Sequence, residues 1–201
     1  ALVPWTNQEV MTLCRSFYSK FYHDRIPRTL ILGINPGRFG GGSTGIPFTD
    51  PIRLERDCGI GNGMEKRAEL SSDFIYRMIG AWGGPEKFYQ RFFISSVSPI
   101  GFTANGTNLN YYDRPDLMAM VSKLAPVWLE KQLGFGIQRT MCICLGEGKN
   151  LKFVQALNDK SGYFGEVVSL PHPRFIMQYR RKQLDSFIAR YFEVLNRAAA
   201  A

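Results

Sequence analysis

The sequence predicts an α/β fold, a three-layer αβα sandwich around a mainly parallel, four-stranded sheet. Two observations predict it. Four short apolar runs of strand type alternate with segments whose apolar residues recur at spacings of three and four, as in amphipathic helices. Strands that alternate with helices form βαβ units, whose helices cover both faces of a parallel sheet. The length suits one domain over residues 1–201, with 198–201 expected as a disordered tail.

Each expected strand is a run rich in apolar and β-branched residues that ends near glycine, serine or proline. The second reads FFISSV, and the last stops at Pro171, which His172 follows. Polar residues just past such strands gather at one edge of a parallel sheet, where ligands bind. The expected strands are 28–34, 92–97, 139–145 and 166–170.

The expected helices follow the apolar spacing, and one of them tolerates an internal proline, Pro126, which should kink it. Ser71 and Ser72 interrupt another, so that helix starts either at residue 65 or near Ser71. Residues 49–64 are expected to be irregular. The polar loop 98–112 is long for a connector, which favours a functional role. The expected helices are 7–23, 65–80, a short one from Pro85, 115–133, 150–158 and 178–196.

The charge is basic: 25 Lys and Arg against 17 Asp and Glu give a formal net charge of +8. A compact domain with this balance indicates an anionic partner, and nucleic acid is the first candidate. The alternative is a basic surface that only faces solvent.

Four cysteines, Cys14, Cys58, Cys142 and Cys144, are scattered without a C-x-x-C pair. The last two alternate along one strand and so share a face, as reduced core thiols of a cytoplasmic protein would. This spacing argues against a zinc site, although it leaves an iron–sulfur cluster open. No apolar run reaches the ~18 residues of a membrane span. We expect neither metal nor cofactor, no membrane association and a cytoplasmic location.

The segment 30–48, LILGINPGRFGGGSTGIPF, is a buried strand that empties into a glycine-rich loop. No phosphate-binding G-x-x-x-x-G-K-[ST] motif occurs in the chain. What remains is Asn35 on the glycine loop, Phe48 beyond it, and His172 between two prolines. Asn35, Ser96 and His172 fall at or past the ends of three different strands, so we expect them to converge.

These motifs resemble a known family. Residues 33–48 look like the first motif of SMUG-type (single-strand-selective monofunctional, family 3) uracil-DNA glycosylases. The His172-Pro-Arg sequence is similar to the second motif, and the tetrapeptide GTNL at 106–109 also fits. The resemblance covers about residues 28–174, and the departures from the family pattern described below indicate a divergent, bacterial branch. It implies a three-layer αβα fold and removal of uracil or related bases from DNA in base excision repair.

The resemblance implies a role for each motif residue. Asn35 would hold a water molecule in line with C1′ of the sugar, and His172 would donate to O2 of the departing base. Phe48 would stack on the flipped base, and the backbone of Ile34 and Gly37 would face its carbonyls. The alternatives are a structural Asn-Pro-Gly turn, a capping surface histidine and a core phenylalanine.

Ser96 departs from the family, which has an asparagine on the second strand to read the uracil edge. A hydroxyl cannot make the two-point contact of a carboxamide. Substrates other than uracil, such as xanthine or 5-hydroxymethyluracil, are therefore included in the expectation. The chain likewise lacks the Ser-Pro-Arg-Asn wedge that the family carries after its His-Pro.

Basic and aromatic residues around the motifs are candidates for DNA binding. Arg38 adds a cation to the glycine loop, and the segment after His172 carries apolar residues together with several cations. The alternative is a solvated basic face of the last helix. The candidates in this segment are Arg174, Phe175, Arg180, Arg181 and Lys182.

Together these features predict a monomeric, monofunctional DNA glycosylase that works by water attack, because no lysine lies in either motif. The competing hypothesis is a non-catalytic module that binds single-stranded or damaged DNA. Such a module would keep the basic surface and Phe48 but would have no need of Asn35.

Overall fold

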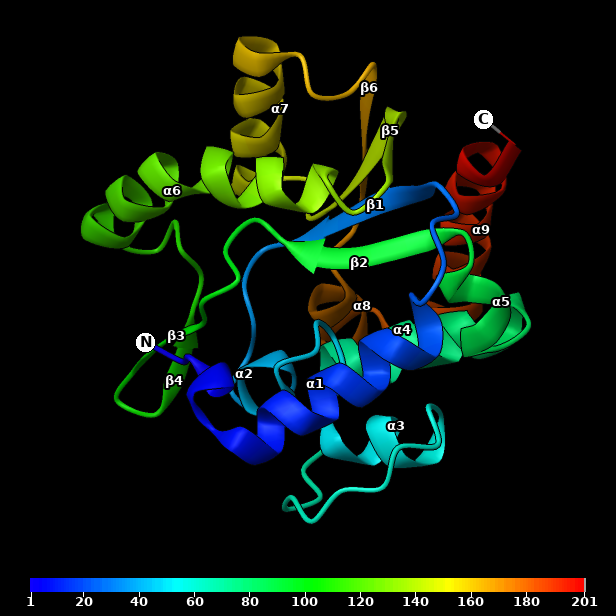
Figure 1. Cartoon of the computed structure of the whole chain (residues 1–201). Coiled ribbons are helices and arrows are strands. Elements are labelled where there is room, and N and C mark those ends of the chain that lie inside the picture. The colour runs from blue at the N-terminus through cyan, green and yellow to red at the C-terminus, as the bar shows by residue number, and fades with distance from the viewer. Residues whose placement is uncertain (201) are drawn as a thin grey trace.

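The central sheet has four strands in the order β2-β1-β5-β6, and every neighbouring pair is parallel. The computed structural model, which describes residues 1–200, places this sheet between two layers of helices (Figure 1). The predicted αβα fold is therefore confirmed. The strands are β1 (Arg28–Gly33), β2 (Phe92–Ser96), β5 (Ile137–Leu145) and β6 (Glu166–Leu170).

Each face of the sheet has its own apolar core, because successive side chains of a strand point to opposite faces. On β1, Ile31 packs into one cluster, whereas Leu30 and Leu32 pack into the other. The first cluster lies against α1 (Gln8–Phe21), α4 (Leu70–Trp82), α5 (Pro85–Tyr89), α8 (Pro173–Tyr179) and α9 (Leu184–Ala200). The second lies against α6 (Pro115–Leu133) and α7 (Lys149–Ser161), which Figure 1 shows on the opposite side.

Two segments that we expected to lack regular structure contain short elements. Within 49–64, α3 (Pro51–Arg56) forms because the Asp50 carboxylate accepts from Arg53 N and Pro51 occupies the first helical position. Within 98–112, β3 (Phe102–Ala104) and β4 (Thr107–Leu109) form an antiparallel hairpin. Its turn is Asn105-Gly106, with φ of 49° and 72°, the strongest short hairpin signal in a sequence.

The C-terminal part also differs from expectation. The single helix expected over 178–196 is two helices, separated by Arg180, whose φ of −131° is not helical, and by the 3-10 helix η2 (Arg181–Gln183). The expectation of a disordered tail is wrong for residues 198–200, because α9 runs to Ala200. Ala198 is buried and its carbonyl accepts from Thr29 Oγ1 at 3.5 Å. Residue 201 lies outside the described residues.

The other expected helices and strands are present, with ends that differ by a few residues. Helix α4 starts at Leu70, next to the alternative start at Ser71, and α6 continues through Pro126. All four cysteines are free and buried, and Cys142 and Cys144 share one cluster. Two short elements near the N-terminal half complete the fold, namely η1 (Pro4–Thr6) and α2 (Gly41–Thr44) in the glycine loop. In residues 1–200, none of the helices is long and apolar enough to cross a membrane.

Candidate active site

Asn35, Ser96 and His172 line one pocket at the carboxyl edge of the sheet, as their positions in the sequence predicted. Asn35 follows β1, and Ser96 ends β2, where it pairs with Gly33 of β1. His172 follows β6, on the far side of the sheet. The other predicted site residues that line this pocket are Ile34, Gly37, Phe48 and Arg174.

Phe48 forms an aromatic wall of the pocket. Its ring lies against Gly33 and stands 5.9 Å from the His172 ring, centroid to centroid. Phe48 has a φ of 53°, which is rare for a bulky residue and concentrates at functional sites. The ring is half-buried, with one side packed on the core and the rest facing the pocket. It is therefore not a plain core phenylalanine.

His172 is held as a neutral hydrogen-bond donor. Its Nδ1 accepts from Arg174 N at 3.2 Å, so it caps α8 and carries its proton on Nε2. Burial, with a contribution from the Arg174 charge, lowers the pKa of His172 from 6.5 to about 4. At neutral pH the imidazole is uncharged, and Nε2–H remains available to a ligand. The capping role and a donor role are thus compatible.

Asn35 joins the glycine loop to the hairpin. Its Nδ2 donates to Leu109 O at 3.0 Å, and its Oδ1 accepts from Tyr111 N at 2.9 Å. Nδ2 also approaches Pro36 O, at 3.5 Å, which is a weak contact. A carboxamide has two N–H groups and two lone pairs, so one acceptor position and a weakly engaged N–H remain for a water molecule. The structural and catalytic interpretations of Asn35 therefore do not exclude each other.

The same two segments are also joined through Arg38. Its backbone N–H donates to Asn108 Oδ1 at 3.1 Å, and its guanidinium donates to Gly106 O. The guanidinium also packs 4.4 Å from the Phe39 ring centroid. These contacts hold the exposed Arg38 on the hairpin, so only part of its donor capacity is left for a phosphate.

Ser96 lies between the site pocket and a second cavity of about 870 Å³. Pro36, Gly41 and Pro47 also line both. The second cavity runs along β2 between α1 and α6, and aromatic side chains form part of its wall. Its aromatic lining residues are Trp5, Tyr18, Tyr22, Phe93, Trp128 and Phe135.

Four polar residues that were not predicted site residues also line the pocket: Glu69, Ser71, Asn108 and Asn110. The GTNL tetrapeptide contained the signal for Asn108, since it carried part of the family resemblance. Glu69 belongs to no motif. Its N–H donates to Asp50 Oδ2 at 2.9 Å, which fixes the start of α4 against α3. Burial and the neighbouring Asp50 raise the pKa of Glu69 to about 7.

The residues after His172 form an exposed aromatic and basic cluster on α8. Phe175 is 43% exposed, with its ring centroid 5.7 Å from that of Tyr179, which is 60% exposed. The Arg180 guanidinium lies 5.6 Å from the Phe175 centroid. Tyr179 was not among the sequence candidates. Arg181 and Lys182 are also exposed, although Arg181 approaches Asp73 to 3.9 Å.

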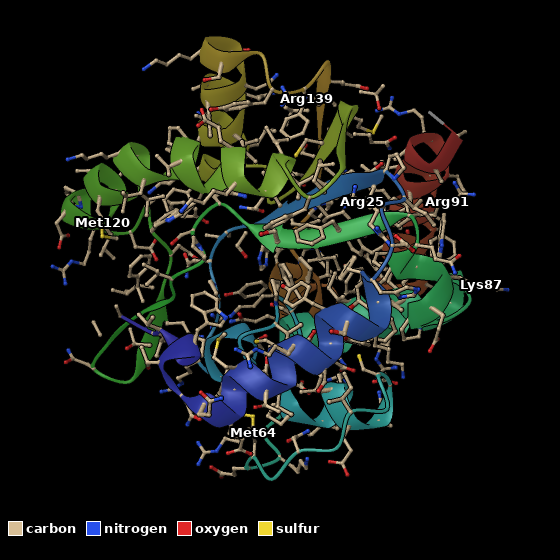
Figure 2. The ribbon with its side chains drawn as sticks, viewed as in Figure 1. Arg25, Met64, Lys87, Arg91, Met120 and Arg139 are labelled. Atoms are coloured by element: carbon tan, nitrogen blue, oxygen red, sulfur yellow. The ribbon has the colours of Figure 1, made fainter. Side chains whose placement is uncertain are left out.

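Basic side chains are not confined to this edge. Figure 2 labels Arg25, Lys87, Arg91 and Arg139, all exposed. Arg25 and Arg91 precede β1 and β2, and Arg139 lies near the start of β5, so these three stand at the amino ends of the strands. Part of the net positive charge therefore faces solvent far from the pocket.

Comparison with known families agrees with this architecture. The model of the uracil DNA glycosylase superfamily matches residues 20–196, so the chain belongs to that superfamily. It is a DNA glycosylase, a hydrolase of the N-glycosidic bond, and its motifs are of the SMUG type.

Among solved structures, wild-type SMUG2 of Pedobacter heparinus is 44% identical to this chain, with a TM-score of 0.92. The alignment covers 97% of this chain and 86% of that one. A search of curated proteins found no match.

Proposed function

We propose that this chain is a monofunctional uracil-DNA glycosylase that binds a flipped base in the pocket of Asn35, Phe48 and His172. One observation carries the proposal: a neutral histidine with a free Nε2–H and an asparagine with spare amide capacity share a pocket with an aromatic wall. An extruded base needs a stacking surface, edge contacts and a donor for the charge it gains on leaving.

In the reaction, the bond between C1′ and the base nitrogen breaks and its electron pair moves onto the base. His172 Nε2–H donates to the base O2 as negative charge develops there, and a neutral imidazole suffices for this. The remaining amide positions of Asn35 hold the water that attacks C1′. The described residues that line the pocket include no lysine, which supports hydrolysis by water over an amine intermediate.

Base selection is proposed for the polar groups around the base edge. Ser96 presents only a hydroxyl, but Asn108 and Asn110 add carboxamides to the same pocket. Backbone groups of Ile34 and Gly37 lie beside them. This set suits uracil and leaves room for other deaminated or oxidised bases, including xanthine and 5-hydroxymethyluracil.

DNA contacts are proposed for the edge that surrounds the pocket. Phe175 and Tyr179 are exposed and next to the site, as a wedge between base steps requires. The cations would neutralise phosphates on either side. They are Arg38, Arg174, Arg180, Arg181 and Lys182. We also propose that the protein is a single-domain monomer and that it acts at the nucleoid in the bacterial cytoplasm.

The test is release of base from oligonucleotides that contain uracil, hypoxanthine, xanthine or 5-hydroxymethyluracil, read as strand cleavage after alkali. We expect abasic sites from uracil, and Arg91→Ala, at the opposite edge of the sheet, serves as a control with unchanged activity. No abasic site in any single- or double-stranded substrate would exclude the proposal. Tight, salt-sensitive binding without release would instead favour a non-catalytic DNA-binding module.

A further inference from the structure

The glycine loop of the pocket is fitted around the carboxylate of Glu69. An added β-carbon on Gly37 would overlap Glu69 Oε1, and one on Gly40 would overlap Oε2. The same point on Gly37 lies 3.2 Å from Asn108 Nδ2, so the carboxylate and that amide flank one stretch of loop. Glycine at both positions is what lets the backbone approach the acid so closely.

This carboxylate is not engaged as a structural ion pair. Among residues 1–200, neither oxygen of Glu69 takes part in a hydrogen bond or an ion pair within 4.0 Å; only its backbone N–H is bonded, to Asp50. Glu69 is half-buried, and its oxygens are not among the buried polar atoms left without a partner, so the carboxylate is open to the pocket that it lines. A bound water molecule or substrate group would supply the missing donor.

The charges that face Glu69 keep its proton exchangeable near neutral pH. Asp50 repels its negative charge, although Asp50 itself pairs with Arg53 at 3.2 Å. Arg174 on α8 attracts it, and His172 beside Arg174 is neutral. Arg38, on the glycine loop, is turned to Gly106. Burial dominates, and it raises the pKa of Glu69 to about 7.

The pocket otherwise lacks a base. Asn35 can orient water but is not basic, and His172 uses Nδ1 to cap α8 while Nε2 carries a proton. Among the described residues that line the pocket, Glu69 is the only carboxylate. General-base catalysis works best when the base titrates near the operating pH.

We propose that Glu69 is the general base of the reaction, taking the proton of the water that Asn35 holds. The inference rests on the proposed function. As the water oxygen bonds to C1′, one of its protons moves to the Glu69 carboxylate, and the electron pair of the glycosidic bond leaves with the base. The base departs as an anion that accepts a hydrogen bond from His172 Nε2–H, and Glu69 later returns its proton to solvent.

The experiment measures single-turnover release of uracil between about pH 5 and pH 9 for the wild type, Glu69→Gln and a control, Glu86→Gln. Glu86 is exposed on α5, away from the pocket. We expect the wild-type and control rates to rise with pH and to level off above about pH 7. Glu69→Gln should be slower by about 10²-fold or more and should lose this rise, with little change in DNA affinity.

A second variant distinguishes loss of the carboxylate from loss of the folded structure. Glu69→Ala should be inactive, and formate, a small carboxylate that fits the vacated space, should restore part of its rate. Circular dichroism and thermal unfolding confirm that each variant is folded.

Three outcomes would overturn the proposal. A Glu69→Gln rate like that of the wild type, with the same pH profile, would make Glu69 structural and leave the proposed function intact. A wild-type rate independent of pH, with a slow Glu69→Gln and no formate rescue, would reduce Glu69 to a positioning residue. A wild-type protein that releases no base at all would remove the proposed function and the inference together.

Discussion

The ring of Phe48 rests on the bare α-carbon of Gly33. A β-carbon at Gly33 would come 2.5 Å from Cε2 and 2.6 Å from Cζ of that ring. Gly33 is the last residue of β1, and Phe48 lies fifteen positions later, after the glycine loop has turned back on the strand. The end of β1 therefore provides the surface on which the aromatic wall of the pocket packs.

Replacing Gly33 by alanine should displace Phe48 and damage both folding and activity. We expect a loss of about 1–3 kcal/mol in the free energy of unfolding, as for an overpacked core, and slower base release. Urea unfolding and single-turnover kinetics measure the two effects. Gly80→Ala is the matched control, because a β-carbon there meets nothing within 4 Å and helix α4 favours alanine. Equal behaviour of the two variants would contradict the packing argument.

Replacing Asn35 by alanine should lower both the rate of base release and the stability of the fold. The rate should fall by about 10²-fold, because the attacking water loses its holder. The free energy of unfolding should also fall, by about 1–3 kcal/mol, because Tyr111 N and Leu109 O lose their partner. Kinetics and denaturant unfolding separate the effects. A stable but inactive variant would mean that the amide serves catalysis alone. A destabilised variant that keeps the wild-type rate would mean that Asn35 only forms a structural turn.

His172→Asn separates capping from proton donation. Asparagine is a good N-cap, so α8 should keep its cap, while the donor no longer reaches the base. We expect a rate lower by about 10²-fold with near wild-type stability at neutral pH. His172→Asn activity equal to that of the wild type would exclude the donor role.

The same pair of proteins tests the lowered pKa of His172. The unfolded state binds a proton at 6.5 and the folded state at about 4, so the unfolded state holds more protons between these values. Wild-type stability should therefore fall relative to His172→Asn as the pH drops from 6.5 towards 4. The loss is about 1.4 kcal/mol for each unit of separation between the two pKa values. Parallel stability curves over this range would show that His172 is not buried as described.

The aromatic and basic cluster that follows His172 should contribute most to base release from duplex DNA, in which the bases are stacked. Phe175→Ala and Tyr179→Ala should reduce base release from duplex DNA more than from single strands, since a wedge acts only on a stack. Arg180→Ala should lower the dependence of binding on salt by about one counterion, and Arg91→Ala should not. Uniform losses on both kinds of substrate would point to general DNA affinity instead of a wedge.

The sheet and the convergence at its edge could be predicted because they follow from local pattern. Apolar runs fixed the strands, parallel topology brought their ends together, and the glycine loop located Asn35 and Phe48. The hairpin was missed although Asn105-Gly106 signals it, since β3 and β4 have only three residues each, too few for an alternation to be recognised.

Glu69 could not be found in the same way, because its character comes from distant neighbours. The glycines beside its carboxylate are about thirty residues away in sequence, and the charges that act on it come from Asp50, which caps α3, and from Arg174 on α8. The break at Arg180 has no glycine or proline to mark it. It forms where α8 packs on α4 and α9 continues along the sheet, which is tertiary information.

The bond from Tyr111 N to Asn35 Oδ1 makes one backbone amide depend on a side chain for its protection. Deuterium exchange at Tyr111 therefore reports whether the glycine loop and hairpin are closed on each other, in a protein that has bound no substrate. In His172→Asn this amide should stay protected, and in Asn35→Ala it should exchange quickly. Exchange at this one amide thus distinguishes a variant whose pocket is intact but inactive from a variant in which the glycine loop and the hairpin have separated.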